Sequence, residues 1–195
     1  LVGRFVDFEA VRAAKELQLF VSATNVRTGE LRVFRRDEMT ADMIVASACL
    51  PHLFRAVEID GDAYWDGGYV GNPALYPLVG ATETENLLLV QINPLQRKQV
   101  PKTRDEIMAR INEITFNSSL MSELRGLTFV GELIDEGKLP RGTGVGQYRR
   151  INFHRIALTE SAQALDTASQ MNTDYDFFEM LRTNGRRAAR RFLDA

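Results

Sequence analysis

One short apolar run, Leu87-Leu88-Leu89-Val90-Gln91-Ile92, constrains the fold more than any other segment of this sequence. Its nearly continuous apolar character makes it the most convincing core strand in the chain. Downstream, apolar residues recur at three- and four-residue steps from Thr103 to Gly137, which predicts a long helix ended by Gly137 and Pro140. Strands that alternate with helices predict an α/β fold.

Two antiparallel hairpins are predicted upstream of this run. The first joins a strand over 19–24 to a strand over 31–34, and the apolar and β-branched residues of 19–24 indicate burial. The second joins 55–59 to 63–65 through Asp60-Gly61, a dipeptide typical of a two-residue hairpin turn. Each hairpin would place its two strands side by side in a sheet.

The helices are predicted from capping residues and prolines. Asp7 is expected to cap a helix over 8–17, and Thr40 is expected to cap a helix that stops before Pro51. The remaining predicted elements are a short helix from Pro73 to about Val79, a strand over 150–158, and two closing helices, the last over about 175–193.

The predicted sheet has few strands for its many helices. An open α/β sheet of this content would leave an apolar face or edge uncovered. The chain starts with Leu1-Val2-Gly3-Arg4, which is neither an initiator methionine nor a signal peptide. We therefore expect residues 1–195 to be the C-terminal portion of a single domain whose opening βα units are missing.

Composition excludes several classes of protein. A formal net charge of −2 argues against a nucleic-acid-binding surface spread over the whole chain. No apolar run reaches the length of a membrane span. Cys49 is the only cysteine, which excludes an intrachain disulfide and a cysteine-based metal site. No cofactor is expected, and a cytoplasmic location is the default expectation.

Asp66-Gly67-Gly68 is the sharpest local sign of chemistry in the sequence. The aspartate follows a predicted strand, and the glycines allow positive φ or the close approach of another backbone or a substrate. A carboxylate held at the edge of a sheet can accept a proton from a nearby hydroxyl as a general base. The alternative on local sequence alone is an Asp-Gly turn without chemistry.

Other nucleophiles and bases fit less well. Cys49 and His52 are near each other, but Pro51 ends the helix between them, and a lone cysteine in an apolar helix is usually a small buried residue. Ser47 lies within a helix without flanking glycines, unlike a nucleophile elbow. His154 lies in a predicted strand and is interpreted as a packing or surface residue. The segment 142–146 resembles a phosphate loop only loosely, because no Lys-Ser/Thr follows it.

The last predicted helix is basic on one side and apolar on the other. Such a helix could touch an anionic membrane, or it could pack through its apolar stripe with its arginines in water. The arginines are Arg186, Arg187, Arg190 and Arg191, and the stripe comprises Phe177, Leu181, Ala188 and Phe192.

Several segments together resemble the patatin-like phospholipase family, and they extend over nearly the whole chain. Their order and spacing make the resemblance more specific than the Asp-Gly-Gly sequence alone. The segments are 21–25 with Thr28-Gly29, the A-S-x-x-x-P-x-x-F pattern of 46–54, Tyr64-Trp65-Asp66-Gly67-Gly68-Tyr69 with Asn72-Pro73, and, as in bacterial members, 110–137 and 185–193.

The resemblance implies a three-layer open sheet flanked by helices and a serine lipid acyl hydrolase with a Ser-Asp dyad. A serine on a G-x-S-x-G elbow would attack an ester carbonyl, and Asp66 would accept its proton and later help to activate water. An upstream glycine-rich loop would stabilise the oxyanion. Neither element is in these residues, so an N-terminal segment of the same protein is the implied source of the nucleophile.

Two interpretations remain open. In the first, the chain is a fragment of an active esterase that acts on a lipid or another acyl ester and is completed by its N-terminal portion. In the second, it is a non-catalytic scaffold or interaction domain. The family dyad requires no calcium, and the sequence has no D-x-D-x-D-G loop. The chain alone is expected to be inactive, because its base faces a serine that another stretch of polypeptide supplies.

Overall fold

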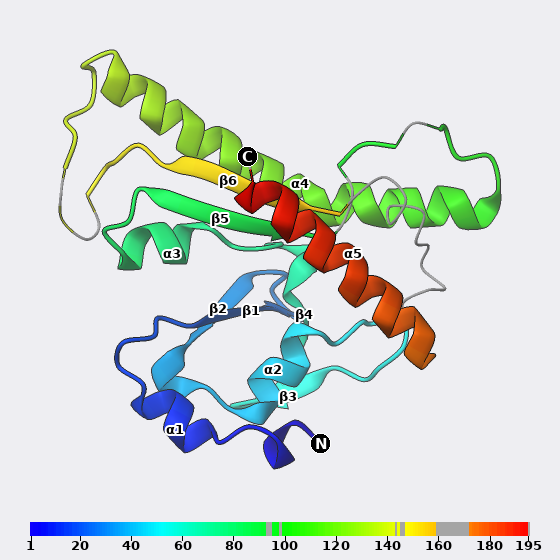
Figure 1. The fold of residues 1–195 in the computed structure, drawn as a ribbon. Coiled ribbons are helices and arrows are strands. Elements are labelled where there is room, and N and C mark those ends of the chain that lie inside the picture. Colours follow the sequence, from blue (N-terminus) through cyan, green and yellow to red (C-terminus); the bar gives the residue numbers. More distant parts are fainter. Residues whose placement is uncertain (93–94, 98, 143, 145–146, 159–171, 195) are drawn as a thin grey trace. The chain divides into compact units, whose positions relative to one another are not determined.

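The α/β class is confirmed by a computed structural model with both helices and strands (Figure 1). The chain divides into two compact units. Unit 1 comprises Leu1–Glu83 and Ser118–Arg149, and unit 2 comprises Thr84–Asn117 and Arg150–Ala195. The structure describes residues 1–92, 95–97, 99–142, 144, 147–158 and 172–194.

Unit 1 is built on a four-stranded antiparallel sheet with the order β2-β1-β4-β3. Both predicted hairpins are confirmed. Asp60 (φ 52°) and Gly61 (φ 86°) form the tight turn of the second hairpin in left-handed conformations, as an Asp-Gly hairpin turn requires. The strands are β1 (Phe20–Asn25), β2 (Leu31–Arg35), β3 (Val57–Ile59) and β4 (Asp62–Asp66).

Two helices of unit 1 start at the predicted caps. The Asp7 carboxylate accepts hydrogen bonds from the backbone N–H groups of Glu9 and Ala10, both at 3.0 Å, at the start of α1 (Phe8–Ala13). The Thr40 hydroxyl caps α2 (Ala41–Ser47). The predicted end of the first helix at residue 17 is wrong. Residues 15–17 are exposed, so a longer helix would bury no further apolar surface.

The third helix, α3 (Tyr76–Ala81), starts later than predicted, because Pro77 rather than Pro73 occupies its first turn. Both of its ends are fixed by charged side chains. The Glu123 carboxylate accepts hydrogen bonds from the N–H groups of Leu75 (2.7 Å) and Tyr76 (3.0 Å). Buried Arg149 donates to the carbonyls of Val79 (2.6 Å) and Thr82. These charges match the polarity of the two helix ends.

The core of unit 1 lies between the sheet and helices α1 and α2. The rings of Phe34 and Tyr64 meet edge to face at 5.6 Å, which joins β2 to β4 across β1. The buried members of this core come from the sheet, from α2 and from the residues before it: Ala23, Phe34, Met39, Met43, Ala46, Ile59 and Tyr64.

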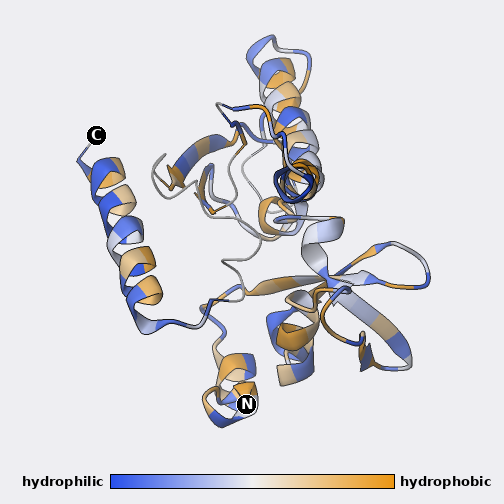
Figure 2. Ribbon diagram, turned by 90° about the vertical axis from the view of Figure 1, so that its right-hand side faces the viewer, coloured by the Kyte–Doolittle hydropathy of each residue, from blue (hydrophilic) through white to orange (hydrophobic). Residues whose placement is uncertain are grey.

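Unit 2 contains a two-stranded parallel sheet of β5 (Asn86–Gln91) and β6 (Asn152–Ala157), in register from Asn86↔Asn152 to Gln91↔Ala157. The closing helix α5 (Tyr175–Leu193) is confirmed at its predicted place. Hydrophilic and hydrophobic residues are interspersed along it (Figure 2). It packs on β6, where the rings of His154 and Phe192 lie 6.3 Å apart.

The strand predicted at 87–92 is confirmed in place as β5, but one face of this predicted core strand is exposed in the described structure. Side chains alternate across β5, and Leu88 and Val90 are 52% and 65% exposed on one face. Among the described residues β5 pairs only with β6. A strand with one neighbour has one free edge, and nothing among the described residues fully covers this apolar face.

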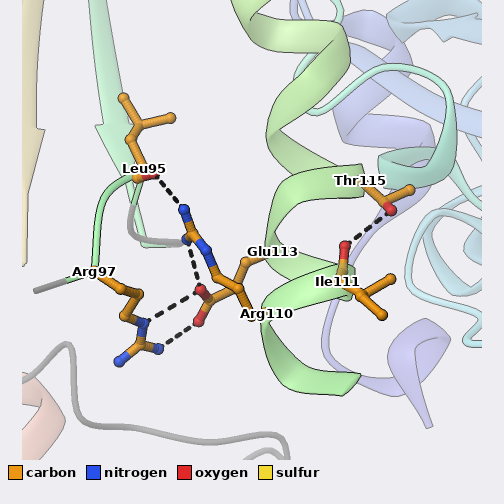
Figure 3. Close-up of polar contacts among 6 residues, drawn as sticks. All are labelled: Leu95, Arg97, Arg110, Ile111, Glu113 and Thr115. Carbon is orange, nitrogen blue, oxygen red and sulfur yellow. Dashed lines mark hydrogen bonds and ion pairs between the residues drawn. The ribbon is translucent and has the colours of Figure 1, made fainter. Parts of the chain in front are cut away.

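A charge cluster fixes the segment after β5 to the start of α4 (Arg104–Asp135) (Figure 3). The Glu113 carboxylate binds Arg97 (Nε to Oε2, 3.2 Å) and Arg110 (NH1 to Oε2, 3.0 Å), and Arg110 also donates to the Leu95 carbonyl at 3.0 Å. Burial acts to raise the pKa of Glu113, but the hydrogen bonds and charges of the two arginines outweigh it and lower that pKa. The cluster thus holds an ionised carboxylate between two guanidinium groups.

The long predicted helix is confirmed as α4; it ends at Asp135, and Gly137 follows in the left-handed conformation (φ 70°). Its predicted apolar positions Ile107, Ile111 and Ile114 are exposed, because periodicity identifies a shared face but not what covers it. In the part of the chain that is described, no helix is long and apolar enough to cross a membrane. The predicted helix before 175 lies outside the described residues.

Candidate functional site

Asp66 stands at the end of β4, where the chain leaves the sheet and enters a short 3-10 helix over Gly67–Tyr69. Its backbone is held from two sides. The Asp66 N–H donates to the Cys49 carbonyl at 2.9 Å, and the Thr24 hydroxyl donates to the Asp66 carbonyl at 2.8 Å. Thr24 is buried in the neighbouring strand β1. The position of Asp66 therefore depends on both flanking segments, β1 and the residues after α2.

The Asp66 carboxylate is partly buried and has a fixed orientation. Its Oδ1 accepts a hydrogen bond of 2.7 Å from the backbone N–H of Gly68, which caps the 3-10 helix. In the described part of the chain no donor is bonded to Oδ2. One carboxylate oxygen is thus committed to orientation, and the other can receive a proton.

Gly67 is required by a close approach of β1. A Cβ atom at this position would lie 2.3 Å from the Ser22 carbonyl oxygen and 2.6 Å from the Ser22 hydroxyl. The predicted close approach of another backbone is confirmed at Gly67, whereas neither Gly67 nor Gly68 adopts positive φ. Any side chain here would push Asp66 and β1 apart.

Burial sets the electrostatics around Asp66. It raises the pKa of the Asp66 carboxyl, and the Gly68 hydrogen bond only partly opposes this effect. The pKa of the Tyr69 hydroxyl is raised by burial and by the negative charge of Asp66. The Asp66 carboxyl therefore holds its proton more tightly than an exposed aspartate, and as a carboxylate it is a stronger base.

The other candidates from the sequence are engaged elsewhere. Burial raises the pKa of the Cys49 thiol, which donates to the Arg55 carbonyl at 3.1 Å, and His52 is exposed. The Ser47 hydroxyl donates to the Ile44 carbonyl at 2.8 Å within α2. His154 lies in unit 2, with its Nε2 3.0 Å from Asn86 Oδ1. Among the residues described, no group of three or more His, Cys, Asp or Glu side chains could hold a metal ion.

The sequence singles out Asp66 as a candidate but does not indicate the groups that hold its backbone in place. Thr24 belongs to the 21–25 segment that carried the family resemblance, yet its hydrogen bond to Asp66 spans 42 residues of sequence. The Cys49 carbonyl is a backbone group, so no residue type in the sequence indicates its role. The segment 142–146 lies partly outside the described residues.

We predict that Gly67→Ala destabilises the protein by about 3 kcal/mol, because the added methyl group meets backbone atoms of β1 that cannot rotate away. Urea unfolding gives the change in free energy. Gly80→Ala in α3 is the matched control, since a Cβ there meets nothing within 4 Å, and it should be neutral or mildly stabilising. Equal stability of the two variants would contradict the close approach.

The raised pKa of Asp66 makes stability depend on pH. The folded state binds the Asp66 proton more tightly than the unfolded state does. This proton therefore stabilises the folded state fully below the ordinary carboxyl pKa of about 3.9, and the stabilisation is lost as pH rises through the raised pKa of the folded state. Asp66→Asn should melt above the wild type at pH 7, with a difference that shrinks below about pH 4. Asp60→Asn, in an exposed turn, is the control. If the difference in melting temperature between Asp66→Asn and the wild type were the same at every pH, the raised pKa of Asp66 would not be its cause.

Comparison with known proteins identifies the N-terminal part of the chain. Residues 4–79 match the family model described as Patatin-like phospholipase, and the match contains β1 to β4 and Asp66-Gly67-Gly68. The resembling segments 110–137 and 185–193 lie outside it. No curated protein matches the chain. Over residues 4–79 the chain is therefore similar to the patatin-like phospholipases, and this similarity points to lipid acyl hydrolysis at the level of the family.

Proposed function

We propose that this protein is a serine lipid acyl hydrolase, of phospholipase A or esterase type, in which Asp66 is the general base of a Ser-Asp dyad. The observation that carries the proposal is the Asp66 carboxylate itself. It is partly buried, it is oriented through Oδ1 by the Gly68 N–H, and its pKa is raised. A base of this kind lies within the residues that match the family.

The chemistry assigned to Asp66 has two steps, and in each step the carboxylate accepts a proton and then gives it up. In the first step, a serine hydroxyl attacks the ester carbonyl of the substrate while Oδ2 of Asp66 accepts the hydroxyl proton. The leaving alcohol takes up that proton and departs, and an acyl-enzyme is left. In the second step, Asp66 accepts a proton from water, hydroxide attacks the acyl-enzyme, and the proton returns to the serine.

The nucleophile is proposed to come from a segment of the same protein outside residues 1–195, because no G-x-S-x-G occurs in this sequence. The exposed apolar face of β5 supports the presence of such a segment. Leu88 and Val90 are exposed on a strand of the type that parallel sheets bury. Polypeptide that adds a strand beside β5, or a helix over it, would bury these side chains.

The same missing motif supports a second candidate function, a non-catalytic patatin-like scaffold or interaction domain. The two candidates differ in what they require of Asp66. A scaffold needs Gly67 for packing but has no use for a carboxylate whose burial costs stability. A dyad needs both residues.

We predict that Asp66→Asn in the complete protein lowers the hydrolysis of a p-nitrophenyl ester by about 10³-fold, in the range expected for loss of a general base. Asparagine keeps an acceptor for the Gly68 N–H but cannot take a serine proton. Asp60→Asn, which alters the hairpin turn at the far end of β4, should retain activity. Full activity of Asp66→Asn would refute the dyad.

A fluorophosphonate ester probe tests the source of the serine. It should label the complete protein on a serine outside residues 1–195, and the 195-residue chain alone should be neither labelled nor active. Intact-mass measurement of the purified sample shows whether a second polypeptide accompanies the chain. Labelling of Ser47 or another serine of the chain alone would contradict the proposal, and absence of labelling in the complete protein would favour the scaffold.

A further inference from the structure

Helix α5 presents a dense basic surface to solvent. Its arginines are all exposed, and no acidic residue occurs between Met180 and Leu193. Arg182 pairs with Glu179 (2.5 Å), and among the described residues the other four arginines form no ion pair. The five are Arg182, Arg186, Arg187, Arg190 and Arg191. The acidic residues of this segment, Asp174, Asp176, Glu179 and Asp194, lie toward the two ends of α5, so the middle of the helix is basic.

The apolar stripe of α5 is already used in folding. Ala188 is buried, and the Phe192 ring packs edge-on against His154 of β6. Phe177 and Leu181 are more buried than their neighbour Phe178. The helix can therefore keep its place on β6 while its opposite side contacts a partner.

Apolar side chains lie among the arginines on the solvent side. Tyr175, Phe178 and Leu193 are 72%, 50% and 77% exposed. Steps of three, four or seven residues place them on one side of the helix with Arg182 and Arg186. Aromatic and aliphatic groups beside guanidinium groups suit a surface that is anionic outside and apolar just beneath.

We propose that this side of α5 binds the surface of an anionic phospholipid bilayer. Charge complementarity supports this partner, and the exposed Tyr175, Phe178 and Leu193 favour a bilayer over a nucleic acid, which offers no apolar layer to receive them. The whole chain has a net charge of −2, so attraction to an anionic surface depends on a local cluster of arginines such as that of α5. The inference goes beyond the proposed hydrolysis, since it concerns docking alone.

Co-sedimentation with vesicles tests the proposal on the complete protein. Ether-linked phospholipids are used, because they have no ester bond that Asp66-dependent chemistry could cleave. Vesicles of phosphatidylcholine with phosphatidylserine should bind the protein, and vesicles of phosphatidylcholine alone should bind it much more weakly. Each arginine near such a surface contributes about fivefold in affinity. The double variant Arg186→Gln/Arg190→Gln should therefore bind about 25-fold more weakly.

The matched control is Arg104→Gln/Arg125→Gln, which removes the same charge from exposed positions of α4 and should bind like the wild type. Phe178→Ser should weaken binding without a change in net charge. The proposal would be overturned if the protein bound both lipid mixtures equally, or if the α4 and α5 variants lost the same affinity for vesicles. It would also be overturned if Phe178→Ser bound vesicles like the wild type and the protein bound RNA as tightly as vesicles. None of these outcomes bears on Asp66, because no turnover is measured.

Discussion

The antiparallel pairing of β4 with β1 is the interaction on which the candidate site depends. It sets Ala23 opposite Asp66 and brings the Thr24 hydroxyl onto the Asp66 carbonyl. It also brings the backbone of Ser22 so near Gly67 that no other residue fits there. The position of Asp66, its hydrogen bond from Thr24 and the need for glycine at position 67 all follow from the register of β1 and β4. A shift of that register by one residue would remove all three together.

Asp66 illustrates a conflict between stability and chemistry. A partly buried carboxylate with one firm hydrogen bond has lost solvation that the protein does not fully replace. The same loss makes it a better proton acceptor. Residues that support a fold seldom combine these properties, whereas catalytic groups often do. Asp66 lies at the end of a sheet whose buried core includes the edge-to-face contact of Phe34 and Tyr64.

Local features were predictable from the sequence, and long-range features were not. The caps at Asp7 and Thr40 and the Asp60-Gly61 turn depend on a few neighbouring residues, and the structure has all three. Asp66 could be singled out by its glycines, but its anchors come from Thr24 and Cys49, far away in sequence. The prediction that β5 lies in the core is wrong for its exposed face. An apolar run shows that a strand favours burial, but it does not show which other elements cover the strand. Nothing local in the sequence marks the ends of α3 as bound by Glu123 and Arg149.

The exposed face of β5 has a consequence for the solubility of the chain. Among the described residues β5 has one unpaired edge, and the side chains of Leu88 and Val90 are exposed on one of its faces; separate molecules can associate through such a surface. Association between folded molecules, more than unfolding, would then limit the concentration that the 195-residue chain alone can reach in solution. A single lysine on the exposed side of this strand would act as a gatekeeper, and solubility would improve without any change in the sheet that holds Asp66.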